Sequence, residues 1–182
     1  MTPGLMQQTP LLISAILRFA AEAHARREIV SRQIDGPVWR YDYAGLARRS
    51  AQAAHALTRL GVEPGDRVSS LAWNTHRHLE LFYAVSGAGA VLHTGNPRLF
   101  DEQIAYTINH AGSAVLLFDK NLLATVERIG PRLTTVTTYV MLGDETAHDD
   151  VLVTEPSQGR RVADEHARVK ARCAIERRSG HR

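Results

Sequence analysis

Cysteine is almost absent from this 182-residue chain, which contains only Cys173. A single cysteine excludes an intramolecular disulfide framework and a zinc site built from several cysteines. No apolar stretch approaches the roughly 20 residues that a membrane helix needs. The first residues also lack the basic start and apolar centre of a signal peptide. These absences predict a cytoplasmic protein without a transmembrane segment, and they leave peripheral association with a membrane open.

Lysine is scarce too, since Lys120 and Lys170 are the only lysines among 22 basic residues. The net charge of +3 is concentrated in residues 151–182, which hold eight basic and four acidic side chains. This segment has no aromatic residue to stack on bases and mixes both signs of charge, so we predict no nucleic-acid partner. Its apolar residues are too sparse for a buried face, which favours a basic, solvated and disordered tail.

The first third of the chain has the pattern of helix, hairpin and helix. Apolar residues recur at three- and four-residue steps over residues 10–26, which predicts a helix after a loose start. Asp35-Gly36-Pro37 is turn chemistry between two short strand candidates. Asp42 stands at the N-cap position of a helix that ends near Leu60, and Gly61 is the natural C-terminal stop.

From residue 67 onward, short apolar strands alternate with amphipathic helices. This alternation is typical of parallel strands joined by right-handed crossovers. We therefore predict an α/β fold, a parallel sheet with flanking helices, for residues 10–150, after a loose N-terminus at residues 1–9. The expected strands are 67–72, 90–93, 114–118 and 137–142, of which 90–93 is expected to be buried. Asn74 or Thr75 is expected to cap the helix that follows the first strand.

Motifs that identify a catalytic or nucleotide site are missing. Gly87-Ala88-Gly89 lacks the third glycine of a dinucleotide fingerprint and precedes a strand, so a helix-to-strand turn is the favoured interpretation. Neither a P-loop nor a nucleophile elbow is present. His76 and His78 are two residues apart, which disfavours a shared metal ion and indicates exposed or rim positions. We assign no catalytic residue and no metal site.

The best candidates for contact with a ligand, judged by position in the sequence, are His93, Thr94 and Asn96. They stand at the end of the strand expected at 90–93, and open α/β sheets bind ligands at the carboxyl ends of parallel strands. We therefore predict that these three residues are adjacent to substrate. The competing interpretation is a loop that holds the Asn96-Pro97 turn in place.

Long stretches of residues 10–150 resemble the N-terminal part of acyl-CoA synthetases, which belong to the AMP-binding, adenylate-forming superfamily. The segments that carry the resemblance include residues 41–65, 65–85 and 89–119. Ala72-Trp73-Asn74 and His93-Thr94-Gly95-Asn96-Pro97-Arg98-Leu99 are most similar to medium- and long-chain fatty acyl-CoA ligases. The resemblance implies a partial N-terminal domain of the adenylate-forming fold, acting in fatty acid metabolism.

Enzymes of this family activate a carboxylate with ATP to an acyl adenylate and pyrophosphate, and then transfer the acyl group to CoA. The resemblance implies that this chemistry needs Mg²⁺, a phosphate loop ending in Pro-Lys-Gly, an aspartate for the ribose and a late lysine. The chain matches none of these elements: residues 134–138 have hydroxyls without glycines, and neither lysine stands in a family motif.

We therefore expect a truncated fragment of a fatty acyl-CoA synthetase, with the reading frame altered near residue 150 by a frameshift or early stop. Fatty acid, ATP, CoA and Mg²⁺ belong to the intact enzyme, and the chain alone is expected to be inactive, to need no cofactor and to self-associate. The alternative is a stand-alone α/β binding or interaction module that pairs with a separate C-terminal piece. Whether the chain is itself an enzyme therefore stays open.

Overall fold

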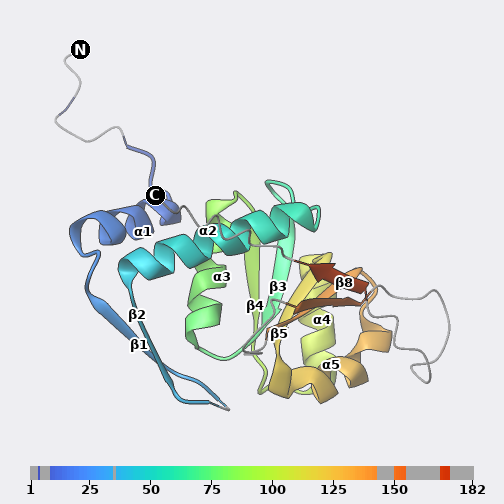
Figure 1. Ribbon diagram of the computed structural model, residues 1–182. Coiled ribbons are helices and arrows are strands. Elements are labelled where there is room, and N and C mark those ends of the chain that lie inside the picture. The colour runs from blue at the N-terminus through green and yellow to red at the C-terminus, as the bar shows by residue number, and fades with distance from the viewer. Residues whose placement is uncertain (1–3, 5–8, 35, 143–149, 155–168, 173–182) are drawn as a thin grey trace.

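Four parallel strands in the spatial order β4-β3-β5-β6 form the centre of the molecule. The computed structural model describes residues 4, 9–34, 36–142, 150–154 and 169–172. The expected α/β fold is confirmed, because each pair of consecutive parallel strands is joined by a helix (Figure 1). The four strands are β3 (Arg67–Leu71), β4 (Val91–Gly95), β5 (Val115–Asp119) and β6 (Thr138–Leu142).

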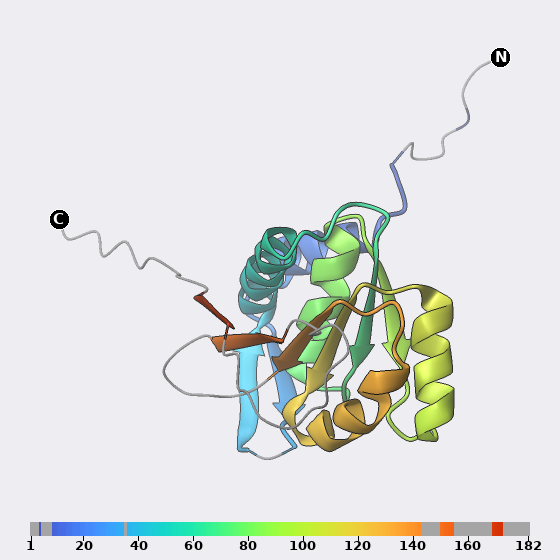
Figure 2. The same cartoon turned by 90° about the vertical axis from the view of Figure 1, so that its right-hand side faces the viewer.

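Helices cover both faces of this sheet (Figure 2). One face packs against α2 (Tyr43–Arg59) and α3 (His76–Gly87), and α1 (Ile13–Ala23) lies on these two helices. The other face packs against α4 (Asp101–Ala111) and α5 (Leu123–Ile129). Since β5 lies between two other strands and under both helical layers, all five of its residues are buried. The remaining helical turns are η1 (Lys120–Leu122) and η2 (Gly130–Arg132).

Two apolar cores result, one on each face of the sheet. Val115 and Leu117 of β5 belong to the core under α2 and α3, whereas Leu116 and Phe118 belong to the core under α4 and α5. This alternation follows from the two-residue period of a strand. It also fixes which residues of the neighbouring strands face which helical layer.

The structure places two strands in the C-terminal region, β7 (Asp150–Thr154) and β8 (Val169–Arg172). β7 pairs antiparallel with β6, and β8 pairs antiparallel with β7. The sequence predicted a solvated tail from residue 151, because hydrophobic periodicity fades there. The remainder of that segment lies outside the described residues.

The hairpin of β1 (Glu28–Arg32) and β2 (Val38–Asp42) stands apart from the main sheet and pairs only with itself. It was expected from the turn at residues 35–37. Asp42 caps α2 as predicted, since its Oδ1 accepts a hydrogen bond of 2.7 Å from the Gly45 N–H. Gly61 follows this helix with a φ of 85°, a conformation that suits glycine.

Two local predictions need correction. Thr75 occupies the N-cap position of α3, but its side chain makes no capping hydrogen bond. The strand expected at 90–93 was read as buried, yet Val91 is 53% exposed, because β4 is the edge strand of the sheet. β4 also continues to Gly95, so His93 lies in the middle of the strand and not at its end.

Candidate functional site

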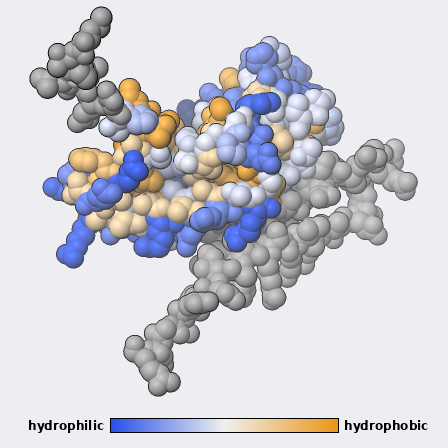
Figure 3. Space-filling view, turned by 90° about the horizontal axis from the view of Figure 1, so that it is seen from above, coloured by the Kyte–Doolittle hydropathy of each residue, from blue (hydrophilic) through white to orange (hydrophobic). Residues whose placement is uncertain are grey.

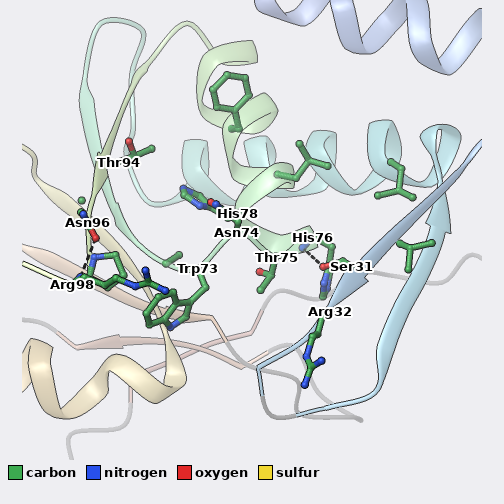
Figure 4. Close-up of a pocket in the computed structure, with 17 residues that line it drawn as sticks. Ser31, Arg32, Trp73, Asn74, Thr75, His76, His78, Thr94, Asn96 and Arg98 are labelled. Atoms are coloured by element: carbon green, nitrogen blue, oxygen red, sulfur yellow. Dashed lines mark hydrogen bonds between the residues drawn. The ribbon is translucent and has the colours of Figure 1, made fainter.

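A cavity of about 910 Å³ lies at the carboxyl ends of β3 and β4. β1 of the hairpin forms one side, the loop after β3 and the first turns of α3 form the back, and the loop after β4 forms the other side (Figure 4). This is the edge at which open α/β sheets bind ligands. Its lining comes from residues 29–32, 72–76, 78–79, 82 and 94–98.

Of the three residues predicted to be adjacent to substrate, Thr94 and Asn96 line this cavity and His93 does not. Thr94 pairs in register with Ser70 and therefore shares the sheet face that α3 covers. Asn96 has a structural task, because its Oδ1 accepts a hydrogen bond of 3.0 Å from the Arg98 N–H. This bond supports the competing interpretation of Asn96 as a turn residue.

His93 points to the opposite face of the sheet, toward the α4 layer. Its Nδ1 lies 2.8 Å from the Ser69 Oγ, which is also 2.8 Å from the Ser113 Oγ. Both serines are fully buried, and burial lowers the pKa of His93. Since strand side chains alternate between faces, the structure does not bring His93 together with Thr94. His93 ties three chain segments together on the far side of the sheet.

His78 lines the cavity, and its ring packs against Ser70 of β3, which does not line it. The His78 Nε2 lies 3.0 Å from the Ser70 Oγ, and burial lowers the pKa of His78 while nearby Asp119 raises it. A serine beside a histidine can act as a nucleophile only if substrate reaches its oxygen. Ser70 is 1% exposed, so this pair supports the fold and not covalent catalysis.

Two exposed arginines, Arg32 and Arg98, bring positive charge to the cavity. The Arg98 guanidinium carbon lies 5.7 Å from the ring centroid of Trp73, within the range of a cation–π interaction. Phe82 and Leu79 supply an apolar wall. The cavity therefore offers cationic groups beside an apolar surface, a combination that suits a ligand with an anionic group and an apolar body.

Asp119, at the end of β5, holds the loop behind the cavity. Its Oδ2 accepts a hydrogen bond of 2.7 Å from the Trp73 backbone N–H, and the residue is 3% exposed. Burial raises the pKa of this carboxyl, whereas the Trp73 hydrogen bond and the positive charges of Arg77 and His78 lower it. Asp119 therefore positions Trp73 without lining the cavity itself.

His76 is buried, and the prediction that it is exposed or on a rim is wrong. It is 2% exposed and stacks on Trp39 of the hairpin, with ring centroids 4.8 Å apart. Its backbone N–H donates a hydrogen bond of 2.8 Å to the Ser31 Oγ (Figure 4). Burial, with smaller contributions from Arg77 and Arg49, lowers the pKa of His76 to about 4. These contacts hold the hairpin against the start of α3.

Arg49 and Glu80 make a second connection behind the hairpin. The Arg49 Nε donates a hydrogen bond of 2.6 Å to the Glu80 Oε1, and the Glu80 side chain is 8% exposed. The same guanidinium lies 5.5 Å from the ring centroid of Trp39. Burial raises the pKa of Glu80, and Arg49 lowers it. The pair links α2 to α3 and supports the hairpin residue that stacks on His76.

A magnesium nucleotide needs carboxylate oxygens for the metal and a cluster of donors for the phosphates. The lining of the cavity contains no carboxylate. Within the described part of the chain, no cluster of histidine, cysteine, aspartate or glutamate could hold a metal ion. These residues therefore do not fit a magnesium–ATP site by themselves, and we assign no adenylation step to them.

The model of the family described as AMP-binding enzyme matches residues 17–174. The chain belongs to this family. The match runs past residue 150, the boundary that the loss of hydrophobic periodicity had predicted. The resemblance to acyl-CoA synthetases is thereby confirmed, and members of this family use ATP and CoA.

This chain is similar to several curated ligases. It is 49% identical over 140 residues to the 3-methylmercaptopropionyl-CoA ligase of Ruegeria lacuscaerulensis, covering 77% of this chain and 26% of that protein. It is 42% identical to the long-chain-fatty-acid–CoA ligase of Thermus thermophilus, covering 98% of this chain and 33% of that protein. The chain thus spans about a quarter to a third of the length of these relatives.

Solved structures confirm the fold. A Mycobacterium tuberculosis fatty acyl CoA synthetase has a TM-score of 0.64 at 26% identity, covering 72% of this chain and 26% of that chain. The N-terminal domain of FACL13 from the same organism has a TM-score of 0.63 at 26% identity, covering 72% and 34%. The α/β architecture is therefore that of the N-terminal domains of acyl-CoA ligases.

Sequence reasoning missed Trp73 and Arg98 as site residues. Both lie in the loops that follow parallel strands β3 and β4, so the rule that selected Thr94 would also have selected them. Arg32 could not be found in this way, because it comes from a hairpin outside the main sheet. In the part of the chain that the structure describes, no helix has the length and apolar character to cross a membrane.

Proposed function

We propose that this chain forms the N-terminal part of an AMP-forming acyl-CoA ligase for aliphatic carboxylic acids. The observation that carries the proposal is the 42% identity to a long-chain-fatty-acid–CoA ligase over 178 residues. A medium-chain-fatty-acid–CoA ligase from Ectopseudomonas oleovorans, 41% identical over 145 residues, supports the same acid class. We assign residues 10–150 to the partial AMP-binding domain.

In this proposal the cavity at the ends of β3 and β4 faces the acid substrate. The Thr94 hydroxyl supplies a hydrogen-bonding group, and Asn96 keeps the loop that carries Arg98 in place. In this proposal, the chain's own residues bind the acid substrate and orient it. In the intact enzyme, ATP, Mg²⁺ and CoA act through the family's phosphate loop, ribose-binding aspartate and late lysine. This 182-residue polypeptide matches none of these elements.

The 182-residue polypeptide alone is expected to release no pyrophosphate above background from ATP, Mg²⁺ and a fatty acid. Each missing hydrogen-bond donor that would stabilise the charge developing in the transition state lowers the rate by a factor of roughly 10² to 10³. A coupled pyrophosphate assay with octanoate and palmitate measures this, with the Thermus thermophilus ligase as the positive control. Turnover by the polypeptide alone would contradict the expectation.

Thr94 is expected to affect acid binding, and His93 is not. The host is a chimera in which this chain replaces the aligned 33% of the Thermus thermophilus ligase. Thr94→Val should raise KM for the acid by about two- to tenfold, the effect of losing one hydrogen bond. His93→Gln serves as the matched control, because His93 faces the other side of the sheet. Equal effects of the two variants on KM would contradict a role of Thr94 in binding the acid.

A further inference from the structure

Three buried polar atoms at the back of the cavity lack a hydrogen-bond partner. They are Trp73 Nε1, Thr75 Oγ1 and His76 Nδ1, and the part of the chain that the structure describes offers none of them a partner. All three residues line the cavity. Burying a hydrogen-bonding group without a partner is unfavourable, so such groups call for an explanation in a folded protein.

Thr75 stands where α3 begins, and its hydroxyl does not cap the helix. A threonine at this position ordinarily accepts a hydrogen bond from the first turn, but the Thr75 side chain accepts none. The residue is 6% exposed, and its side chain faces the cavity (Figure 4). Because Oγ1 makes no hydrogen bond to the described residues, none has to break when it turns to a ligand. The N-terminus of this 12-residue helix is also the positive end of its dipole, which favours an anion.

Trp73 brings a second donor and a positive charge to the same place. Its backbone N–H is occupied by Asp119, whereas the indole Nε1 can only donate and has no partner among the described residues. The Arg98 guanidinium carbon lies 5.7 Å from the centroid of the Trp73 ring. One loop thus presents two unused donors beside a guanidinium, and the cavity lining holds no carboxylate that would repel an anion.

An apolar stripe runs from this point along α3. Leu79 and Phe82 follow Thr75 at steps of four and three residues, which places all three on one face of the helix. All three line the cavity, and Phe82 is 41% exposed although its side chain is large and apolar. A helix rises 1.5 Å per residue, so Phe82 lies about 10 Å along the axis from Thr75. The stripe therefore offers an apolar surface beside the donors.

We propose that the N-terminus of α3 binds the carboxylate of an aliphatic acid. The Thr75 hydroxyl and the Trp73 indole N–H donate to the carboxylate oxygens, and hydrogen bonds to an ionised acceptor are the stronger kind. The hydrocarbon chain lies on Leu79 and Phe82. A phosphate could use the same donors but would gain nothing from the apolar stripe. The inference rests on the proposed function, because it gives the acid substrate of that reaction a position and a direction in the cavity.

Isothermal titration calorimetry of the 182-residue chain with octanoate at neutral pH tests this proposal. Octanol, an uncharged probe with an aliphatic chain of the same length, should bind about tenfold more weakly or worse. Thr75→Val and Trp73→Phe should each weaken octanoate binding by about two- to tenfold and leave octanol binding unchanged. Because the Thr75 hydroxyl makes no hydrogen bond to the described residues, Thr75→Val should not lower the free energy of unfolding.

Two control variants accompany the titration. Thr58→Val is the matched one, since Thr58 is exposed on α2 and its hydroxyl bonds only within that helix, to the Ala54 carbonyl at 3.1 Å. Figure 3 shows a second apolar surface, over α1, where an aliphatic chain could bind without a carboxylate subsite. Ile16→Ser/Phe19→Ser alters this surface at positions that are 60% and 63% exposed. Both controls should bind octanoate like the original chain.

The proposal is overturned if octanoate does not bind, if octanol binds as tightly, or if Thr75→Val leaves octanoate binding unchanged. It is also overturned if Thr75→Val loses binding and unfolding free energy together, because the hydroxyl would then support the fold. Acyl-CoA formation by the chimera without any effect of Thr75→Val would reject the subsite and keep the ligase function. Octanoate binding that depends on Thr75, with a chimera that forms no acyl-CoA, would reject the function and keep the subsite.

Discussion

Replacing Arg49 with methionine is expected to lower the free energy of unfolding by about 2 to 3 kcal/mol. The substitution leaves the Glu80 carboxylate, whose side chain is 8% exposed, without the guanidinium that lies 2.6 Å away. Removing one partner of a fully buried pair costs more, but the Arg49 side chain is 38% exposed and solvent screens part of the interaction. Urea unfolding of the variant and the original chain at neutral pH measures the loss.

Arg40→Met is the matched control for this prediction. The Arg40 Nη1 lies 2.8 Å from the Glu28 Oε2, but the two side chains are 59% and 52% exposed, so the loss should stay below about 1 kcal/mol. The double variant Arg49→Met/Glu80→Gln should recover part of the stability, because the uncompensated charge is gone. Equal losses for Arg49→Met and Arg40→Met would show that burial does not strengthen the Arg49–Glu80 pair.

Replacing His76 with phenylalanine is expected to remove a pH dependence of stability. The pKa of His76 is lowered from its ordinary value of 6.5 to about 4, so the unfolded chain binds more protons between these values. The stability that depends on neutral His76 is therefore complete above pH 6.5 and is lost as the pH falls toward 4. The loss amounts to about 3 kcal/mol at the acid end.

Phenylalanine can keep the stack on Trp39, and the bond from residue 76 to Ser31 uses the backbone N–H. His78 and His93 act in the same direction as His76, whereas Glu80 and Asp119, whose pKa values are raised, act in the opposite one. The quantity to measure is therefore the difference between variant and original chain across pH 4–7. His110→Phe, at an exposed position, should leave the pH dependence intact. If His76→Phe also leaves it intact, the attachment of the hairpin to α3 does not depend on a neutral His76.

The layer structure could be predicted because each element carries its own periodicity. The helix caps and stops at Asp42 and Gly61 are local signals, and the parallel order follows from alternating strands and helices. The position of His76 was not predictable in this way. It is buried by Trp39 and Ser31, which lie 37 and 45 residues earlier in the chain, and nothing in its own helix indicates that contact.

The site was predicted in part for a similar reason. Thr94 was found from its place near the end of a parallel strand, and it lines the cavity. His93 was assigned by the same rule, but β4 continues two residues further than expected, to Gly95. A shift of one residue along a strand moves a side chain to the other face of the sheet. The end of β4 is set by its pairing with β3, so the local sequence pattern could not predict it.

The most direct test of the proposed function is acyl-CoA formation by the chimera with the Thermus thermophilus ligase. This chain supplies the aligned 33% of that protein, and the parent enzyme supplies the remainder. If the chain is the N-terminal part of a fatty acyl-CoA ligase, the chimera should form acyl-CoA from ATP, CoA and palmitate, whereas the 182-residue polypeptide should not. A chimera that folds, as shown by a cooperative thermal transition, and yet forms no acyl-CoA would contradict the account.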